Sequence, residues 1–381
     1  MRRWRVSLFD QLVNEALRSR AELTALRPVV EKELLHHDIL REMSEAGLLT
    51  GLTFIGGTCL RACYGSSRLS EDLDFTGGSD FQRSDLAELA RVLVDRLQTR
   101  YGLPVSVSEP VKTGGQVSTW KLTIEIRPGR KHLPAQRIHL DICAIPSHDP
   151  RPMMLRNLYG IDLGTSGLIL QAQSREEILA DKVIALAFRE NRIKNRDLWD
   201  IAWLIQQGIE LPVQLIPLKI RDHQREPAEF TALLKDRIAA LKTQPELRDE
   251  FIKEMRRLLP AATVRDTIDK ELYWAYLTQL VDDLARKAMS DLKRESNLSL
   301  GNSISAASYH DDLLLLRRCP IIPSPQSATS CCAADKWAMR CDGPSRFTIC
   351  AAAPTSSPHQ KRQVGGIKNY IPDFEFQIQT S

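Results

Sequence analysis

The order of apolar and polar positions divides the chain into stretches with a helical period and stretches with an extended one. Residues 10–47 repeat apolar side chains at helical spacing, and Pro28 fits the start of a helix or a kink within it. The short apolar segment "LTFIGG" follows and has the character of a strand. We expect a further helix over "SDLAELARVLVDRLQTRYG", capped by Ser84 and closed by Gly102.

Three later segments are rich in β-branched residues and bounded by glycine or proline, which predicts strands. They are "PVSVSE" from Pro104, "VSTWKLTIEIR" from Val117 and "RIHLDICAI" from Arg137. Together with two strands nearer the N-terminus they predict a small mixed sheet. After Ser174 the pattern becomes amphipathic helix and remains so to about residue 290. The expected fold class is α+β, a mixed β-sheet domain with flanking helices followed by a helical domain.

This pattern predicts four parts: a helical lead-in over 1–50, a sheet domain over 51–170, a helical domain over 171–296 and an atypical tail over 297–381. The tail holds five of the eight cysteines and seven of the twenty prolines and shows no sustained period of 2 or 3.6. We expect it to be poorly ordered. A shifted or read-through reading frame is one hypothesis for its composition.

Composition narrows the class of protein. With 43% hydrophobic and 26% charged residues, and no apolar run long enough to span a membrane, the chain is expected to be soluble. Its start is basic but lacks the apolar region of a secretory signal, so we expect a cytoplasmic protein. The net charge of +4 is too small to indicate a nucleic-acid binder by itself. The cysteines before residue 297 form no CxxC pair or zinc spacing and are interpreted as buried thiols.

Three aspartates are the strongest candidates for chemistry. Asp72 and Asp74 lie two positions apart, which puts both on one face of a strand, and Asp141 stands mid-strand in "RIHLDICAI". If the three converge, their repulsion favours protonation or a divalent cation, and oxygen-only ligands suit Mg²⁺ or Mn²⁺. The alternative is that Asp141 bonds to backbone amides or pairs with Arg68 or Arg137. The sequence alone leaves both interpretations open.

The "GGT" of residues 56–58 supplies a complementary feature. Gly56 and Gly57 allow backbone amides to approach a ligand closely, and a helix that begins at Thr58 would favour phosphate at its N-terminus. A Gly-Gly pair after a strand is also an ordinary turn, and this alternative stays open.

The order GG[TS], DxD and a separate strand aspartate resembles the DNA-polymerase-β-like nucleotidyltransferases. More narrowly, "FIGGTCLRACYGSSRLSEDLDF" with "EEILADKVIALAFRENRIKNRDLWDIAWL" resembles the AbiEii/AbiGii toxin family of type IV toxin-antitoxin and abortive-infection systems. The resemblance covers roughly residues 30–290 and leaves the tail outside. It implies that residues 51–170 are the catalytic domain and that the helical domain contributes to the active site.

The resemblance also implies roles that the pattern alone leaves undecided. Lys182 would hold nucleotide phosphates, although by its position on the helix it could equally be a surface lysine. Asp197, or Asp200 one turn later, would orient Lys182 or assist the acceptor as a base, and the alternative is an ordinary helix ion pair. Arg68 and Ser70 would contact a phosphate or fix the loop, with a solvated loop as the alternative.

The function implied is a Mg²⁺- or Mn²⁺-dependent nucleotidyltransferase. Asp72, Asp74 and Asp141 would bind metal, while residues 56–58, Arg68, Ser70 and Lys182 would bind the NTP. RNA, including tRNA 3′ ends, is the expected acceptor, and a cognate antitoxin is the expected partner, with or without a stable complex. Two alternatives remain: a DxDxT phosphatase with Asp72 as nucleophile, and a non-catalytic interaction protein or damaged gene product that keeps the fold.

Overall fold

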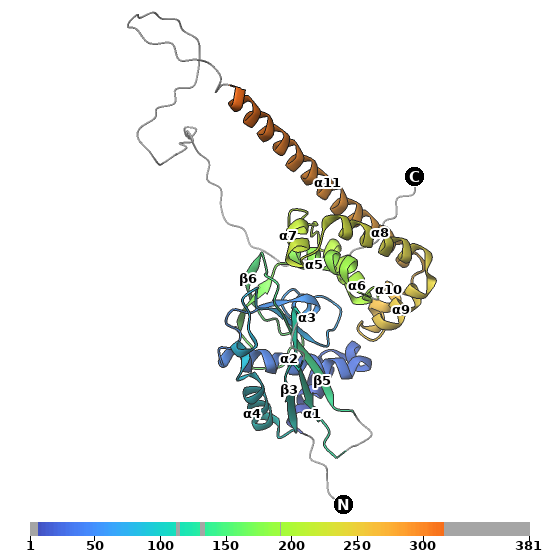
Figure 1. The fold of residues 1–381 in the computed structure, drawn as a ribbon. Coiled ribbons are helices and arrows are strands. Elements are labelled where there is room, and N and C mark those ends of the chain that lie inside the picture. The colour runs from blue at the N-terminus through green and yellow to red at the C-terminus, as the bar shows by residue number, and fades with distance from the viewer. Residues whose placement is uncertain (1–6, 112–114, 130–133, 191, 316–381) are drawn as a thin grey trace, which may run out of the picture. The chain divides into compact units, whose positions relative to one another are not determined.

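The structure, a computed structural model, describes residues 7–111, 115–129, 134–190 and 192–315, with side chains as far as residue 294. These described residues belong to one compact unit. Three helical segments open the chain (Figure 1): α1 (Leu8–Ser19), the 3-10 segment η1 (Ala21–Leu26) and α2 (Arg27–Glu45). Pro28 lies in the first turn of α2, where a missing N–H costs no hydrogen bond. Of the two predicted placements for Pro28, the helix start is the one observed.

Seven strands form one mixed sheet in the order β3-β4-β5-β2-β1-β7-β6. Their bounds are β1 (Thr53–Ile55), β2 (Leu73–Thr76), β3 (Val105–Ser108), β4 (Val117–Ile124), β5 (Gln136–Cys143), β6 (Pro150–Met154) and β7 (Ile169–Gln173). β2 runs antiparallel to β1 and parallel to β5. The predicted α+β class with a mixed sheet is confirmed.

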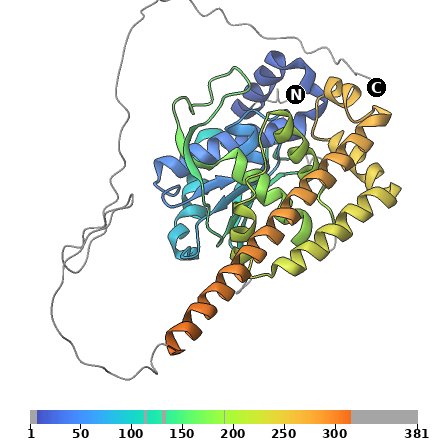
Figure 2. The same cartoon turned by 90° about the horizontal axis from the view of Figure 1, so that it is seen from above.

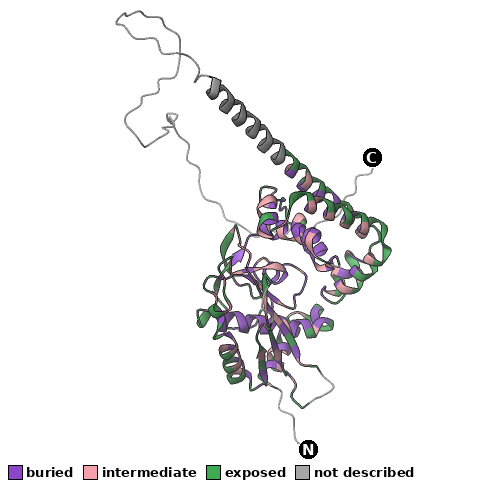
Figure 3. Ribbon diagram, viewed as in Figure 1, coloured by how far each residue is buried: buried purple, intermediate pink, exposed green. Residues whose placement is uncertain are grey.

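Side chains alternate across the central strands, and this alternation creates an apolar face and a polar face. On β2, Leu73 and Phe75 are fully buried, and Phe75 packs on Phe54 of β1 with ring centroids 5.1 Å apart. On β5 the buried positions are Ile138, Leu140 and Ile142. Helix α2 contacts β5 and α4 (Leu89–Tyr101) contacts β3. Figure 3 shows buried residues along the sheet and on the inner sides of the helices that contact it. The aspartates of β2 and β5 therefore face away from the apolar layer.

Helices make up the rest of the described chain. They are α3 (Gly56–Ala62), the 3-10 segment η2 (Arg83–Leu86), α5 (Arg175–Phe188), α6 (Asn195–Gln206), α7 (Leu215–Asp222), α8 (Pro227–Thr243), α9 (Pro245–Met255), α10 (Ala261–Asp266) and α11 (Glu271–Leu315). Helices α5 to α9 contact one another, and α6 also contacts α3 and α11. Figure 1 shows them gathered apart from α1, α2 and α4, and Figure 2 gives the view from above. None of the described helices is long and apolar enough to cross a membrane.

Three local predictions need correction. Ser84 lies inside η2, which is capped by Gln82 and Asp85, and α4 begins only at Leu89, although Gly102 does close it. The sequence pattern missed β6 and β7. In β6 the prolines at 150 and 152 argue against a strand, and they are tolerated because β6 lies at the edge of the sheet.

The expected tail boundary at residue 297 also differs from the structure. It falls within α11, which continues to Leu315. The helix can continue because no proline interrupts the chain between Pro260 and Pro320. The predicted tail beyond residue 315 lies outside the described residues.

Candidate active site

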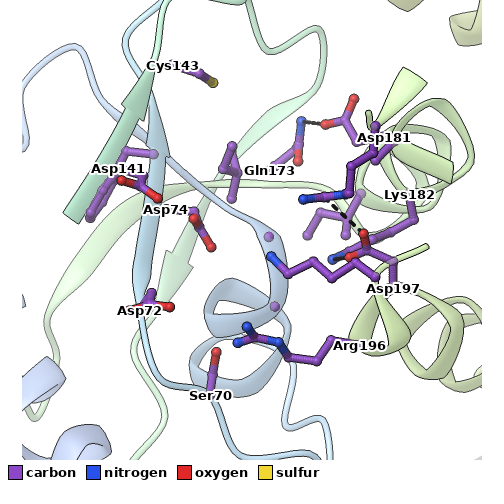
Figure 4. A pocket seen from close by; sticks show the side chains of 18 of the residues that line it. Ser70, Asp72, Asp74, Asp141, Cys143, Gln173, Asp181, Lys182, Arg196 and Asp197 are labelled. Carbon is purple, nitrogen blue, oxygen red and sulfur yellow. Dashed lines mark hydrogen bonds and ion pairs between the residues drawn. The ribbon is translucent and has the colours of Figure 1, made fainter. Parts of the chain in front are cut away.

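A cavity of about 320 Å³ lies where the turn from β1 into α3, the strands β2 and β5, and the helices α5 and α6 meet (Figure 4). Nine of the ten residues that the sequence indicates as site residues line it, and only Thr58 does not. The nine are Gly56, Gly57, Arg68, Ser70, Asp72, Asp74, Asp141, Lys182 and Asp197. Residues separated by more than a hundred positions therefore meet in one place.

Asp74 and Asp141 are direct neighbours across the parallel pair of β2 and β5, because the register places them opposite one another. The pKa of Asp74 is raised, and burial is the main cause. The ammonium groups of Lys194 and Lys182 oppose this effect, whereas the neighbouring carboxylates of Asp141 and Asp72 add to it. Oδ1 of Asp141 is buried and has no hydrogen-bond partner. Two adjacent carboxylates, one with an unsatisfied buried oxygen, form a site with a need for positive charge.

Asp72 lies one residue before β2, and its side chain is 28% exposed. Its Oδ1 accepts a hydrogen bond of 3.1 Å from the backbone N–H of His139 and lies 3.2 Å from Nδ1 of that residue. Within the described chain, no group of three His, Cys, Asp or Glu side chains is arranged to hold a metal ion. The three aspartates share one cavity, but the bonds to His139 engage the Asp72 carboxylate.

The two glycines bring backbone close to charged side chains. Gly56 has φ +75°, and a Cβ at this position would lie 3.0 Å from Oδ2 of Asp74. A Cβ on Gly57 would clash with the guanidinium of Arg68. Glycine is therefore required at 56 both for the left-handed backbone and for the approach to Asp74.

Thr58 and Ser70 have a structural task that the sequence did not reveal. The hydroxyl of Thr58 lies 2.6 Å from that of Ser70 and donates to the backbone carbonyl of Asp72. The backbone N–H of Ser70 donates to Oε1 of Glu33 at 2.8 Å. The side chain of Thr58 therefore fixes the loop before the aspartates and does not line the cavity.

The same loop is held from two further directions. Glu33 of α2, which binds Ser70, is itself paired with Arg61 at 3.1 Å and accepts a hydrogen bond from the hydroxyl of Tyr159. The N–H of Leu69 donates to the carbonyl of Leu258 in the helical part at 2.9 Å. These contacts fix the backbone that leads into Asp72 and Asp74.

Opposite the carboxylates, α5 and α6 carry a buried network of alternating charges. Nζ of Lys182 lies 2.6 Å from Oδ1 of Asp197 and 3.0 Å from Oδ2 of Asp200. Arg68 donates two hydrogen bonds of 2.9 Å to the two oxygens of Asp200, and Arg189 lies 3.1 Å from Asp197. Arg68 is therefore a partner of α6 rather than a residue of a solvated loop. Both aspartates contact Lys182, and of the two it is Asp197, the one favoured from the sequence, that lines the cavity.

The pKa values in this network follow from burial opposed by neighbouring charge. Burial disfavours the charged form of Lys182, but Asp197 and Asp200 outweigh it and raise the pKa of this lysine. Burial likewise opposes ionisation of Asp197, but Lys182, Lys194 and Arg189 lower its pKa to about 2. Lys182 is 12% exposed and charged, which rules out the surface-lysine interpretation.

The sequence missed Lys194, Arg189 and Arg196 as cavity residues. Lys194 precedes α6, and burial lowers its pKa, with charges of both signs around it. Among the described residues it forms no ion pair, which leaves its ammonium available to an anion. The basic run "RENRIKNR" contained the signal, but only the fold shows which of its side chains turn inward.

The stability that Asp197 contributes is expected to depend on pH. Its pKa falls from 3.8 in the unfolded chain to about 2 in the fold, so the folded state binds this proton less readily. The contribution, about 2 kcal/mol, is present above about pH 4 and is lost as the pH falls towards about 2. In urea unfolding, the difference in free energy between wild type and Asp197→Asn should shrink by about this amount over that range.

Asp249→Asn provides the matched control, because Asp249 is an exposed aspartate on α9. Its difference from wild type should stay near zero at every pH. A constant difference for Asp197→Asn would contradict the lowered pKa.

The chain matches one protein-family model and is similar to several solved structures. No curated protein matches the chain. Among solved structures, JHP933 from Helicobacter pylori is 16% identical with a TM-score of 0.39, covering 72% of this chain and 98% of that one. MenT4, a nucleotidyltransferase toxin from Mycobacterium tuberculosis, is 15% identical with a TM-score of 0.42, covering 72% and 98%. The model of the family described as "Nucleotidyl transferase AbiEii toxin, Type IV TA system" matches residues 38–277, which is more than half of the chain. The chain belongs to this AbiEii family of nucleotidyl transferase toxins.

Proposed function

We propose that the protein transfers a nucleotide from an NTP to a hydroxyl group of an RNA acceptor, with Mg²⁺ or Mn²⁺ as cofactor. The observation that carries this proposal is the pairing of Asp74 and Asp141 in register, opposite the cations of α5 and α6 in one cavity. The carboxylates on one side of the cavity can bind a divalent cation, and the cationic side chains on the other side can bind a triphosphate. Nucleotidyl transfer needs both within a few ångströms of each other.

The carboxylates fit a divalent metal on three grounds. Asp74 and Asp141 are adjacent, Oδ1 of Asp141 lacks a partner, and burial raises the pKa of Asp74. These two residues would hold the ion, and Asp72 would join them by leaving its bonds to His139. When bound, such an ion supplies charge neutralisation at the reacting phosphate and lowers the pKa of an attacking hydroxyl.

The remaining residues of the cavity bind and orient the triphosphate. Lys194 offers an unpaired ammonium, and Lys182 offers a charged one held in position by Asp197 and Asp200. Gly56 and Gly57 let the backbone approach the phosphates. Asp197 positions Lys182 and does not act as a base, since a pKa of about 2 makes it a poor proton acceptor.

The setting proposed for this reaction is the cytoplasm, with a cognate antitoxin as partner. Support for the partner comes from the family description, which names a type IV toxin–antitoxin system. The phosphatase alternative finds little support, because Asp72, its nucleophile, precedes β2 and is bonded to His139.

Incubation with Mg²⁺, each labelled NTP and total RNA tests the proposal. We expect label in RNA with the wild type and none with an Asp72→Asn/Asp74→Asn double variant. A non-catalytic interaction protein would give no labelled RNA, protein or small molecule with either chain. Removal of the metal with EDTA should abolish labelling, and undiminished labelling in EDTA would contradict the metal requirement.

A further inference from the structure

A second cavity, of about 470 Å³, opens between the first turn of α6 and helix α9. We call it the α6–α9 cavity. Lys194 and Arg196 line both this cavity and the candidate active site, so the two adjoin at these residues. A chain-like molecule that extends past these two side chains out of the first cavity would meet the lining of the second.

Positive charge dominates the lining of the α6–α9 cavity. Five cationic side chains line it, against the two carboxylates of Glu250 and Glu254. Arg196 is partly neutralised, because its Nε lies 3.0 Å from Oε1 of Glu254. Three others, Arg192, Lys253 and Arg257, are exposed and form no ion pair within the described part of the chain. The N-terminal end of the twelve-residue α6, which has no side-chain cap, adds partial positive charge.

The chemistry of this lining favours phosphate over bases. Exposed, unpaired lysine and arginine side chains bind the phosphodiesters of a polynucleotide. Base recognition in single strands relies on stacking with aromatic side chains, and no aromatic residue lines the cavity in the described chain. Ile193 is its sole apolar lining residue there.

We propose that the α6–α9 cavity binds the sugar-phosphate backbone of the acceptor next to its reacting end, through Arg192, Lys253 and Arg257, without reading base sequence. This rests on the proposed function, since the reacting hydroxyl would lie in the adjoining active site. Selection of an acceptor by sequence or shape must then come from contacts elsewhere. Backbone binding in the cavity determines only the affinity for the acceptor and the position of its reacting end.

The test measures binding of fluorescent oligo(A), oligo(U) and oligo(dT) to the full chain by anisotropy, without NTP, across a salt series. Wild type should bind all three with similar affinity. Lys253→Ala/Arg257→Ala should bind each more weakly, with the slope of log affinity against log salt reduced by about 1.4, about 0.7 per lost phosphate contact. Both side chains are exposed and unpaired, so folding should be unaffected.

The matched control is Lys235→Ala/Lys287→Ala, two exposed lysines on α8 and α11 outside the cavity. It should leave affinity and slope unchanged. An unchanged slope in Lys253→Ala/Arg257→Ala, or an equal loss in the control, would overturn the proposal. So would a strong preference for one of the three homopolymers that the double variant abolishes. Poly-glutamate that binds through these residues while the oligonucleotides do not would assign the cavity to an acidic protein instead.

Binding without NTP separates this proposal from the proposed function. Transfer that persists with oligonucleotide binding unaffected by Lys253→Ala/Arg257→Ala defeats only the cavity assignment. Normal binding without any transfer defeats only the proposed reaction. In the transfer assay the variant should raise KM for the RNA acceptor and leave KM for the NTP unchanged.

Discussion

Asp74→Asn is expected to reduce nucleotide transfer by about 10³-fold while leaving the fold intact or more stable. The carboxylate stands beside Asp141 on the neighbouring strand, where its negative charge is needed for a metal and costs free energy without one. Because its pKa is raised in the fold, ionised Asp74 destabilises the native state at neutral pH, and the neutral amide removes that cost. Initial rates of transfer and urea unfolding at neutral pH measure the two effects.

Asp80→Asn makes the same chemical change at an exposed position outside the cavity, and should alter neither quantity. Activity near the wild-type level in Asp74→Asn would remove this residue from the reaction. A large loss of stability would assign it a structural role instead.

Asp200→Ala is expected to destabilise the protein by about 3–5 kcal/mol, because it leaves buried cations without a counter-charge. Asp200 is 0% exposed and pairs with both Arg68 and Lys182. Lys182 retains Asp197, but Arg68 loses its bidentate partner. Urea unfolding at neutral pH gives the difference in free energy.

A double variant, Arg68→Met/Asp200→Leu, separates charge burial from packing. It removes one charge of each sign and should recover much of the stability that Asp200→Ala loses. A loss below about 1 kcal/mol for Asp200→Ala would show that the network contributes little to folding.

The local sequence pattern is sufficient to predict the central strands and to identify the carboxylates as candidate site residues. Asp141 stands out in the sequence because it lies mid-strand among the apolar residues Ile138, Leu140 and Ile142, and the pairing of β2 with β5 brings it beside Asp74. Parallel pairing follows from topology, which no local pattern encodes. β6 could not be predicted from local pattern, because its prolines argue against a strand. They are tolerated because β6 is an edge strand, and edge position is a property of the whole sheet.

The partners of charged side chains were the least predictable feature. Arg68 and Asp200 are separated by 132 positions, and their bidentate ion pair depends on how α6 lies beside α3. Thr58 was expected at a phosphate, but its hydroxyl supports the loop that carries Asp72. In each case the residue type was informative, while its role depended on tertiary contacts.

In the proposed reaction, the bond between the α- and β-phosphates of an NTP is broken in this cavity. Parallel reactions with α-labelled and γ-labelled NTP, Mg²⁺ and total RNA test it most directly. We predict that α-label enters RNA and γ-label leaves as pyrophosphate, and that Asp74→Asn reduces both by about 10³-fold. Transfer of γ-label to an acceptor, or its release as free phosphate without incorporation of α-label, would contradict the account.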